Sequence, residues 1–308
     1  MKNATVLCAL VVLALGLPPA SGHCWQEEYE FVLEWGSAGS DTGQFRGPKG
    51  MCADKHSFIY VCDQNNQRVQ KFDSLGNFIM MFGSAGSGSG EFNAPQDVVV
   101  DDSGHIYVTD GLNSRVQKFD SLGGFLLMWG DTGSGPGQFL YPEGIAVDSF
   151  GHLHVTDGGN HRIQEFDNQG NFVGELWSPD SSRWDPMSVA VCGSEIYAYT
   201  YGPPHNVQRF DTVGQFILEW SRYGVAPGEN MLMVDMDTDQ VGNVYAVDYR
   251  PNRCQKFNPS GRFITLWGSG GTGPGQFDGP MGIAVDRDGC VYVSDFGNDR
   301  IQKFRRAN

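Results

Sequence analysis

Three aspartates lie at alternate positions in the second half of the chain, and an asparagine follows shortly after them. The aspartates are Asp235, Asp237 and Asp239, and the asparagine is Asn243. Carboxylate and amide oxygens are the ligands that Ca²⁺ takes in proteins. The segment departs from the EF-hand pattern, because Gln240 stands where that loop requires glycine. The segment is a candidate Ca²⁺ site, and an ordinary solvated acidic turn is the alternative.

A second pattern places an Arg five residues after an Asp. The Asp can accept hydrogen bonds from backbone N–H groups of a turn, and the Arg can bind its carboxylate through two parallel hydrogen bonds. In one copy Thr200 and Asn206 replace both residues, which avoids an uncompensated buried charge. The repetition favours a structural role over a catalytic one. The five pairs are Asp63/Arg68, Asp110/Arg115, Asp157/Arg162, Asp248/Arg253 and Asp295/Arg300.

Aromatic and basic residues are concentrated in the stretch from residue 183 to residue 250. Such residues are the usual anchors of protein interfaces. The stretch is therefore a candidate binding surface; the alternative is that the aromatics repack a degenerate repeat. The candidate residues are Arg183, Trp184, Tyr201, His205, Arg222, Tyr223, Tyr249 and Arg250.

Few residues point to catalysis. The chain has no Gly-x-Ser-x-Gly elbow, no Cys-x-x-Cys and no phosphate-binding glycine loop. A zinc enzyme needs three protein ligands and an open position. His161 and His205 are expected in neighbouring repeats, and we expect no third histidine to converge on them. No catalytic residue is assigned from the sequence.

These residues are positioned by a repeated unit of four short apolar segments. In Gly83–Gly130 the segments read DVVV, HIYV, RVQKF and FLLMW, separated by turns rich in Gly, Asn, Asp and Ser. Segments of this kind predict four antiparallel strands, here named a, b, c and d. The unit recurs after 47, 47, 44, 47 and 47 residues, which predicts an all-β, six-bladed β-propeller. Strand c ends at Phe72, Phe119, Phe166, Phe210, Phe257 and Phe304.

Two of the units closely resemble NHL repeats. They read GPGQFLYPEGIAVDSFGHLHVTDGGNHRIQEFD at Gly135–Asp167 and GPGQFDGPMGIAVDRDGCVYVSDFGNDRIQKF at Gly273–Phe304. The resemblance implies a propeller that serves as a binding platform. Similar propellers end tripartite-motif ubiquitin ligases, but this chain lacks their RING and B-box arrays, so ligase activity is not implied. Amidating lyases with a similar ring hold zinc through several histidines, a pattern that this chain does not match.

The first 22 residues are expected to be a secretory signal peptide. Lys2 precedes the apolar run Val6–Leu17, and small residues follow at a cleavage site. Cleavage would leave residues 23–308 as one secreted domain without a further apolar span. That domain has 20 basic and 36 acidic residues, a net charge of −16. Such a charge disfavours nucleic acids and anionic membranes as partners.

The N-terminal strand is expected to close the ring. Phe31–Gly36 reads FVLEWG and matches a strand d, whereas the last repeat stops after strand c. Pairing the two would remove both open sheet edges. Cys24 precedes this strand, and Cys290 lies in the a–b turn of the same blade. In an oxidising compartment we therefore predict a Cys24–Cys290 disulfide.

The setting of the acidic segment depends on how the fifth blade is aligned. One alignment places Met236, Asp237 and Thr238 in strand a and buries Asp237. The other matches MLMVD to the GIAVD of other blades, so that strand a is Leu232–Val234 and the aspartates lie in an enlarged turn. We expect the second alignment, because it avoids a buried unpaired carboxylate.

The sequence thus predicts a secreted, non-catalytic propeller that binds a protein partner through the face carrying its d–a and b–c loops. A metal-dependent lyase or hydrolase on the same ring is one alternative. A structural subunit of an extracellular assembly is the other. No cofactor is expected apart from the candidate Ca²⁺.

Overall fold

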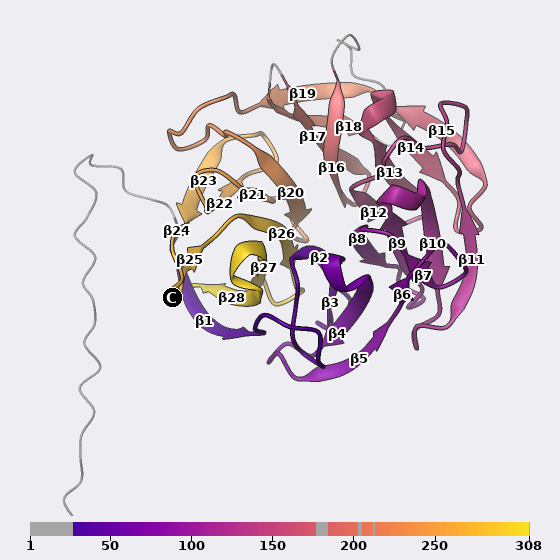
Figure 1. Cartoon of the computed structure of the whole chain (residues 1–308). Helices are drawn as coiled ribbons and strands as arrows, with labels where there is room; N and C mark the ends of the chain where they lie inside the picture. Colours follow the sequence, from indigo (N-terminus) through magenta and orange to yellow (C-terminus); the bar gives the residue numbers. More distant parts are fainter. Residues whose placement is uncertain (1–26, 177–183, 203–204, 212, 308) are drawn as a thin grey trace, which may run out of the picture.

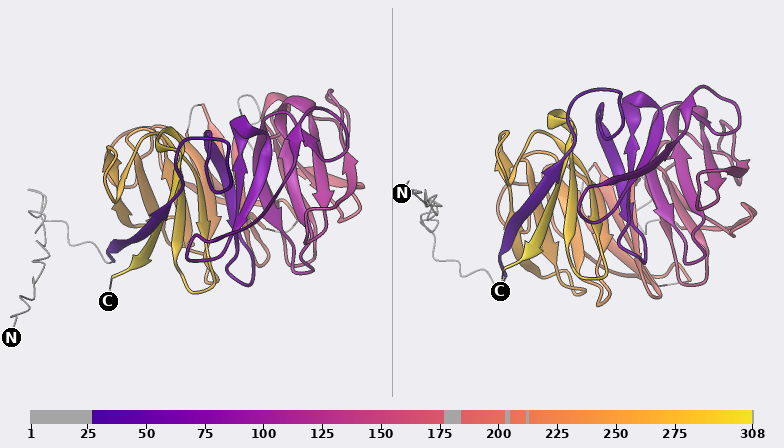
Figure 2. Two further views of the ribbon diagram at one scale, coloured as in Figure 1. Left: turned by 60° about the horizontal axis from the view of Figure 1, so that its bottom comes forward. Right: turned by 90° about the horizontal axis from the view of Figure 1, so that it is seen from below.

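The chain folds as a ring of six four-stranded antiparallel sheets around a central axis (Figure 1). The computed structural model describes residues 27–176, 184–202, 205–211 and 213–307. Each sheet is one blade, and the blades stand side by side to form a short disc (Figure 2). The predicted six-bladed propeller is confirmed.

The strands follow the repeat boundaries expected from the sequence, and the strands of each blade pair in the order a, b, c, d. Blades one to three are β2 (Pro48–Ala53), β3 (Ile59–Asp63), β4 (Arg68–Phe72), β5 (Phe78–Phe82); β8 (Pro95–Val100), β9 (Ile106–Asp110), β10 (Arg115–Phe119), β11 (Phe125–Trp129); and β12 (Ile145–Val147), β13 (Leu153–Asp157), β14 (Arg162–Phe166), β15 (Phe172–Leu176).

Blades four to six complete the ring. They are β16 (Asp185–Cys192), β17 (Glu195–Tyr201), β18 (Val207–Asp211), β19 (Phe216–Trp220); β20 (Met233–Thr238), β21 (Val244–Asp248), β22 (Arg253–Phe257), β23 (Phe263–Trp267); and β26 (Pro280–Val285), β27 (Val291–Asp295), β28 (Arg300–Arg306), β1 (Tyr29–Trp35). Short parallel pairs in the d–a loops join β6 (Ser84–Ala85) to β7 (Glu91–Phe92) and β24 (Ser269–Gly270) to β25 (Gln276–Phe277).

The ring closes where the two ends of the described chain meet. Strand β1 pairs antiparallel with β28, from Tyr29 opposite Arg306 to Trp35 opposite Ile301. Figure 2 shows the indigo strand β1 lying along the yellow strands of the last blade. The expected closure by the N-terminal strand is confirmed, and it leaves neither the first nor the last strand with an unpaired inner edge.

The core between blades is built around one buried aromatic ring from each regular d–a loop. Phe139 is 0% exposed, and its ring centroid lies 5.6 Å from that of Phe166 on strand c. The ring also covers Gly130, where a Cβ atom would lie 2.7 Å from it. The Phe that follows Gln or Glu in each regular d–a loop therefore anchors the loop on its blade. The equivalent residues Phe45, Phe92 and Phe277 are also fully buried.

In five blades an Asp/Arg pair links the b–c turn to the d–a loop that precedes the blade. Arg68 Nε lies 2.7 Å from Asp63 Oδ2, and its other nitrogens donate to the carbonyl oxygens of Ser40, Asp41 and Gln44. The Arg therefore meets the carboxylate through one nitrogen rather than the expected two, because the remaining donors hold the loop. The corresponding distances are 2.8 Å for Arg115–Asp110, 2.9 Å for Arg162–Asp157, 3.2 Å for Arg253–Asp248 and 2.8 Å for Arg300–Asp295.

The expected alignment of the fifth blade is wrong. Strand β20 runs to Thr238, and Asp237 pairs with Tyr245 on β21. The buried carboxylates avoid isolation, because Asp237 accepts hydrogen bonds from the backbone N–H groups of Thr238 and Val285. Asp235 accepts equivalent bonds from two backbone N–H groups. Burial of these two carboxylates is tolerated because strand a of the next blade supplies hydrogen-bond donors.

Candidate binding surface at blades four and five

Trp184 was expected to contact a partner at the surface, but its side chain is part of the core. Its side chain is 2% exposed, and its ring centroid lies 6.0 Å from that of Phe210. Phe139 packs on Phe166 in the same way in blade three. Trp184 is therefore the loop anchor of blade four, and its proposed role as a partner contact is wrong, because burying a large aromatic surface is favourable. Arg183 lies outside the described residues.

Blade five has a polar residue where the other blades bury the anchoring ring. Asn230 occupies that position and is 0% exposed. Its Nδ2 donates to the carbonyl oxygen of His205 at 2.9 Å and to Ser221 Oγ at 2.8 Å. Tyr199, which stands where the other blades carry a smaller side chain, donates its hydroxyl hydrogen to Asn230 Oδ1 at 3.1 Å. These bonds satisfy the buried amide and hold the b–c loop of blade four against the next blade.

Three aromatic rings lie in a row above this network. The ring centroids of Tyr201 and His205 are 5.7 Å apart, and those of His205 and Tyr223 are 5.0 Å apart. Tyr201 is 48% exposed and Tyr223 is 58% exposed. Burial lowers the pKa of His205, which favours the neutral ring. We call Tyr201, His205 and Tyr223 the aromatic row.

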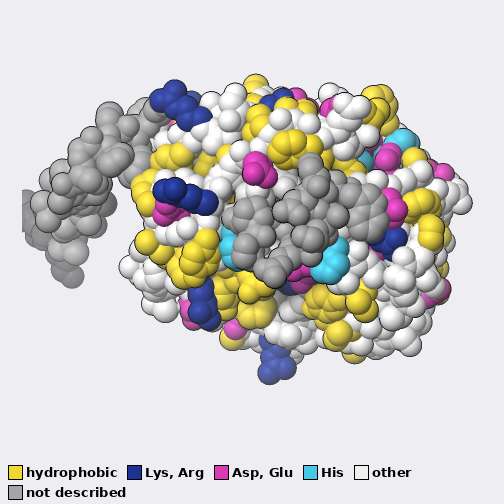
Figure 3. Space-filling model, turned by 90° about the horizontal axis from the view of Figure 1, so that it is seen from above, with side chains coloured by type: hydrophobic (Ala, Val, Ile, Leu, Met, Phe, Trp, Pro, Cys, Tyr) yellow, Lys and Arg dark blue, Asp and Glu magenta, His cyan; other side chains and the backbone are white. Residues whose placement is uncertain are grey.

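The remaining candidates surround the aromatic row less closely. The Arg222 side chain is exposed and pairs with Glu229 at 2.8 Å. Arg250 is exposed and lies 6.0 Å from the Tyr249 ring centroid. Tyr249 itself is half-buried and packs against Gly279, where a Cβ atom would lie 2.8 Å from the ring. Figure 3 looks onto the edge of the disc where β19 lies, and histidine side chains are visible on either side of the middle of this view.

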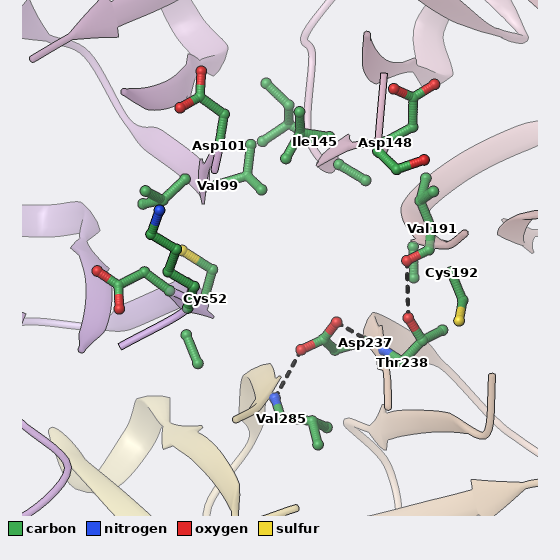
Figure 4. Close-up of a pocket in the computed structure, with 18 of the residues that line it drawn as sticks. Cys52, Val99, Asp101, Ile145, Asp148, Val191, Cys192, Asp237, Thr238 and Val285 are labelled. Carbon is green, nitrogen blue, oxygen red and sulfur yellow. Dashed lines mark hydrogen bonds between the residues drawn. The ribbon is translucent and has the colours of Figure 1, made fainter. Parts of the chain in front are cut away.

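The propeller also has a central cavity, which follows its axis. A cavity of about 650 Å³ is lined by strand a and the a–b turn of every blade, and Figure 4 shows these side chains around an open centre. Asp97, Asp235 and Asp237 are buried in its wall. Asp97 accepts hydrogen bonds from the backbone N–H groups of Val98 and Ile145. Each of these three carboxylates is thus bonded to its own strand and to a neighbouring one.

Burial sets the protonation of these carboxyl groups. It raises the pKa of Asp97 and of Asp237 to about 7, against the opposing effect of their backbone hydrogen bonds. The pKa of Asp235 is also raised, first by burial and then by the charge of Asp97. Asp97 was not among the residues singled out from the sequence. Its signal was present, because Asp97 stands where Gly144 begins the GIAVD phrase of blade three.

The candidate Ca²⁺ ligands are not gathered at one point. Asp239 alone lies in the a–b turn, where it accepts bonds from Asn243 and Val241, while Asp235 and Asp237 are part of strand β20. Among the described residues, no group of three or more His, Cys, Asp or Glu side chains is arranged to hold a metal ion.

The predicted disulfide cannot be placed directly, since Cys24 lies outside the described residues. Cys290 packs at the interface between blades six and one. The chain preceding β1 turns instead toward blade five, where Glu27 pairs with Lys256 at 2.6 Å and Tyr29 stacks on Trp267. The described cysteines are free thiols, and burial raises the pKa of Cys254. The Cys24–Cys290 bridge stays a prediction.

Comparison with known families identifies the repeats. The NHL repeat model matches residues 45–72, 92–119, 139–166 and 277–304, which lie in blades one, two, three and six. Four of the six blades of this propeller therefore contain NHL repeats. Protein lin-41 of Caenorhabditis elegans is 43% identical over 47 residues, which span 15% of this chain and 4% of that protein.

Solved propellers share the fold at low sequence identity. Virginiamycin B lyase from Staphylococcus aureus is 14% identical with a TM-score of 0.62, covering 90% of this chain and 99% of that one. A gluconolactonase from Xanthomonas campestris is 11% identical with a TM-score of 0.64, covering 86% and 88%. A chain of the nidogen/laminin complex is 15% identical with a TM-score of 0.58, covering 73% and 81%.

No described helix is long and apolar enough to cross a membrane.

Proposed function

We propose that this propeller is a secreted, non-catalytic module that binds a protein partner through the loops of blades four and five. The observation that carries the proposal is the aromatic row. Tyr201 and Tyr223 flank His205 on the surface, and about half of each tyrosine is exposed. Exposed aromatic side chains are typical anchors of interfaces, because each contributes a large contact area at a small entropic cost.

The departures of blades four and five from the repeat support the same proposal. Tyr199 and Asn230 compensate each other through a hydrogen bond, and Trp184 replaces the anchoring Phe of the regular blades, so the core stays packed. Repacking of the core therefore accounts for the buried aromatic residues, but it does not account for Tyr201 and Tyr223, which are exposed. The chain from the nidogen/laminin complex gives one instance of a similar fold within a protein assembly. The lyase, the lactonase and the nidogen/laminin chain all share only the fold with this protein, so the proposal rests on the aromatic row and not on them.

A matched pair of variants tests the proposal. Tyr201→Ala combined with Tyr223→Ala removes the exposed tyrosines. Leu122→Ala combined with Phe150→Ala is the control, since these residues are 83% and 72% exposed in turns of the opposite face. Each exposed truncation should change the free energy of unfolding by about 0.5 kcal/mol or less. Immobilised proteins are exposed to extracellular fluid, and captured proteins are quantified by mass spectrometry.

We expect the wild type and the control to capture the same protein in equal amounts. The tyrosine variant should capture at least about tenfold less of it, as loss of interface hot spots implies. Equal capture by all three proteins would refute the aromatic row as the binding surface.

A further inference from the structure

The central cavity has a wide end and a narrow end. Its wide part extends from strand a to the a–b turns of the blades and has a volume of about 650 Å³. Toward the face of the d–a loops, the void on the axis shrinks to about 30 Å³, which holds no more than a few water molecules. A molecule larger than water therefore has access only from the face of the a–b turns. The residues around the narrow void, one from each blade, are Lys49, Gln96, Glu143, Met187, Val234 and Met281.

The lining of the wide part is strongly acidic. The described residues that line it include nine aspartates, against two basic residues, Lys55 and Arg287. Both basic side chains lie in a–b turns beside Asp102, which binds Lys55 through its carbonyl oxygen and Arg287 through its carboxylate. A recess lined by charge of one sign raises the local concentration of ligands of the opposite sign. The lining therefore favours a cation.

Three of these carboxylates are not required by the fold. Asp97 and Asp235 stand at the first position of the strand-a phrase, and Asp237 stands at the third position. The other blades form the same strand with glycine or serine at the first position and with small or apolar residues at the third. Because burying a carboxylate is costly, the packing of strand a does not explain these three. The equivalent residues are Gly50, Gly144, Ser188 and Gly282 at the first position, and Cys52, Val99, Ala146, Ala190 and Ala284 at the third.

The three carboxylates also have no counter-charge. Among the described residues, none of them forms an ion pair with Lys, Arg or His, and Lys49 at the narrow end pairs with Glu143 instead. Asp97 and Asp237 each accept one backbone hydrogen bond per oxygen, which uses two of the about four acceptor sites of a carboxylate. Asp237 is half-buried, and Figure 4 shows its carboxylate beside the open centre. Acceptor capacity therefore remains for a ligand.

The chemistry of the lining distinguishes three classes of cation. A metal ion is not favoured, because the described residues include no group of three His, Cys, Asp or Glu side chains arranged to hold one. Quaternary ammonium ions are typically held by aromatic cages, whereas Phe150 is the one aromatic residue among the described lining residues. An ammonium group with N–H hydrogens suits the carboxylates, because it has three donors and no acceptor. Aliphatic side chains such as Val99 and Val191 lie around the same open centre (Figure 4).

We propose that the central cavity binds a small aliphatic amine, with its ammonium group held by Asp237 and its hydrocarbon chain against the aliphatic wall. Asp97 adds a second negative charge from the opposite side, because blades two and five face each other across a ring of six. The volume lies within the range of about 300–1,000 Å³ that is typical of small-molecule sites. This site opens on the face opposite the aromatic row and is independent of the proposed partner surface.

The probe for this site is 1,6-diaminohexane, titrated into the mature chain. Burial raises the pKa of Asp97 and of Asp237 to about 7, so the titration is done at about pH 8, where both are ionised. Binding is read from the methyl NMR signals of Val99 and Val191. Hexane-1,6-diol is the neutral analogue, and hexamethonium carries the charges without N–H donors. We expect a saturable shift with the diamine and at least about tenfold weaker binding of both analogues, as loss of a charge-assisted hydrogen bond implies.

Two variants locate the ammonium group, and a third is the control. Asp237→Asn removes the charge but keeps the size of the side chain, and it should weaken diamine binding at least about tenfold. Asp97→Asn should weaken it by a smaller factor, because Asp97 acts through its charge. Asp131→Asn removes the same charge from an exposed residue of a d–a loop and should leave binding unchanged. Circular dichroism checks the fold of each variant, and the two analogues test the wild type even if a variant does not fold.

The inference would be overturned by any of four results. The first is the absence of a saturable shift of the cavity methyl signals, and the second is binding of the diol as tight as that of the diamine. The third is equal binding of hexamethonium, because the cavity would then recognise charge without N–H donors. The fourth is an equal effect of Asp131→Asn and Asp237→Asn, which would show that the diamine responds only to the net charge of the protein.

Discussion

Trp184 and Tyr223 belong to the same sequence pattern and have opposite roles in the structure. Trp184 is 2% exposed and anchors a loop, whereas Tyr223 is 58% exposed. Residue type identified both as candidates, but it could not separate them, because burial depends on which position of the loop each occupies. In the regular repeats a Phe occupies the buried position of the d–a loop. In blade four this loop is shorter in sequence, and Trp184 occupies that position.

Truncating these two aromatics should therefore have different consequences for stability. Trp184→Ala removes a buried ring that packs on Phe210 and should lower the free energy of unfolding by about 3–5 kcal/mol. Tyr223→Ala should change it by about 0.5 kcal/mol or less. Urea denaturation followed by circular dichroism measures both. Equal losses would show that Tyr223 is also part of the packing.

At the scale of the strand, β20 illustrates the limit of predicting burial from residue type. The repeat spacing located the strands of the six blades apart from strand a of blade five, because short apolar segments and glycine turns recur in register. It did not show that Asp237 would be buried, since the compensating donor is Val285 N–H, which lies 48 residues away in the next blade. Asp97 was missed for the same reason. Of the three expected metal ligands, Asp235 and Asp237 are strand residues and Asp239 is a turn residue.

The raised pKa of Asp237 predicts a pH effect with a definite sign. The folded state holds this proton up to about pH 7, whereas an unfolded Asp releases it near its ordinary value of about 4. The contribution of protonated Asp237 to stability is fully present below the unfolded pKa and is lost as the pH rises toward 7. The free energy of unfolding should therefore fall by up to about 1.4 kcal/mol per pH unit between these limits.

Asp237→Asn isolates this effect, because the other titrating groups are common to both proteins. The stability of the wild type relative to the variant should decline from pH 4 to pH 7 and then level off. Urea unfolding at intervals across this range measures the difference. Parallel pH profiles would contradict a raised pKa at Asp237.

The whole molecule is a closed ring in which four regular blades match the NHL repeat and two do not. The sequence was sufficient for the ring, the closing strand and the Asp/Arg pairs, because each depends on a repeated local pattern. The candidate surface depends on contacts between blades four and five that break this pattern. In this region the buried amide of Asn230 accepts a hydrogen bond from Tyr199, whereas the rings of Tyr201 and Tyr223 are exposed. We attribute partner binding to the exposed tyrosines, because packing of the core does not require them.

The most direct measurement is site-specific photo-crosslinking on the mature chain. A benzophenone amino acid replaces Tyr223 in one protein and Phe150, 72% exposed on the opposite face, in the other. After irradiation in extracellular fluid, crosslinked products are identified by mass spectrometry. Our account predicts one defined protein crosslinked from position 223, competed by the unlabelled wild type and not by the variant lacking both tyrosines. Crosslinks of the same protein from both positions, or none from position 223, would contradict it.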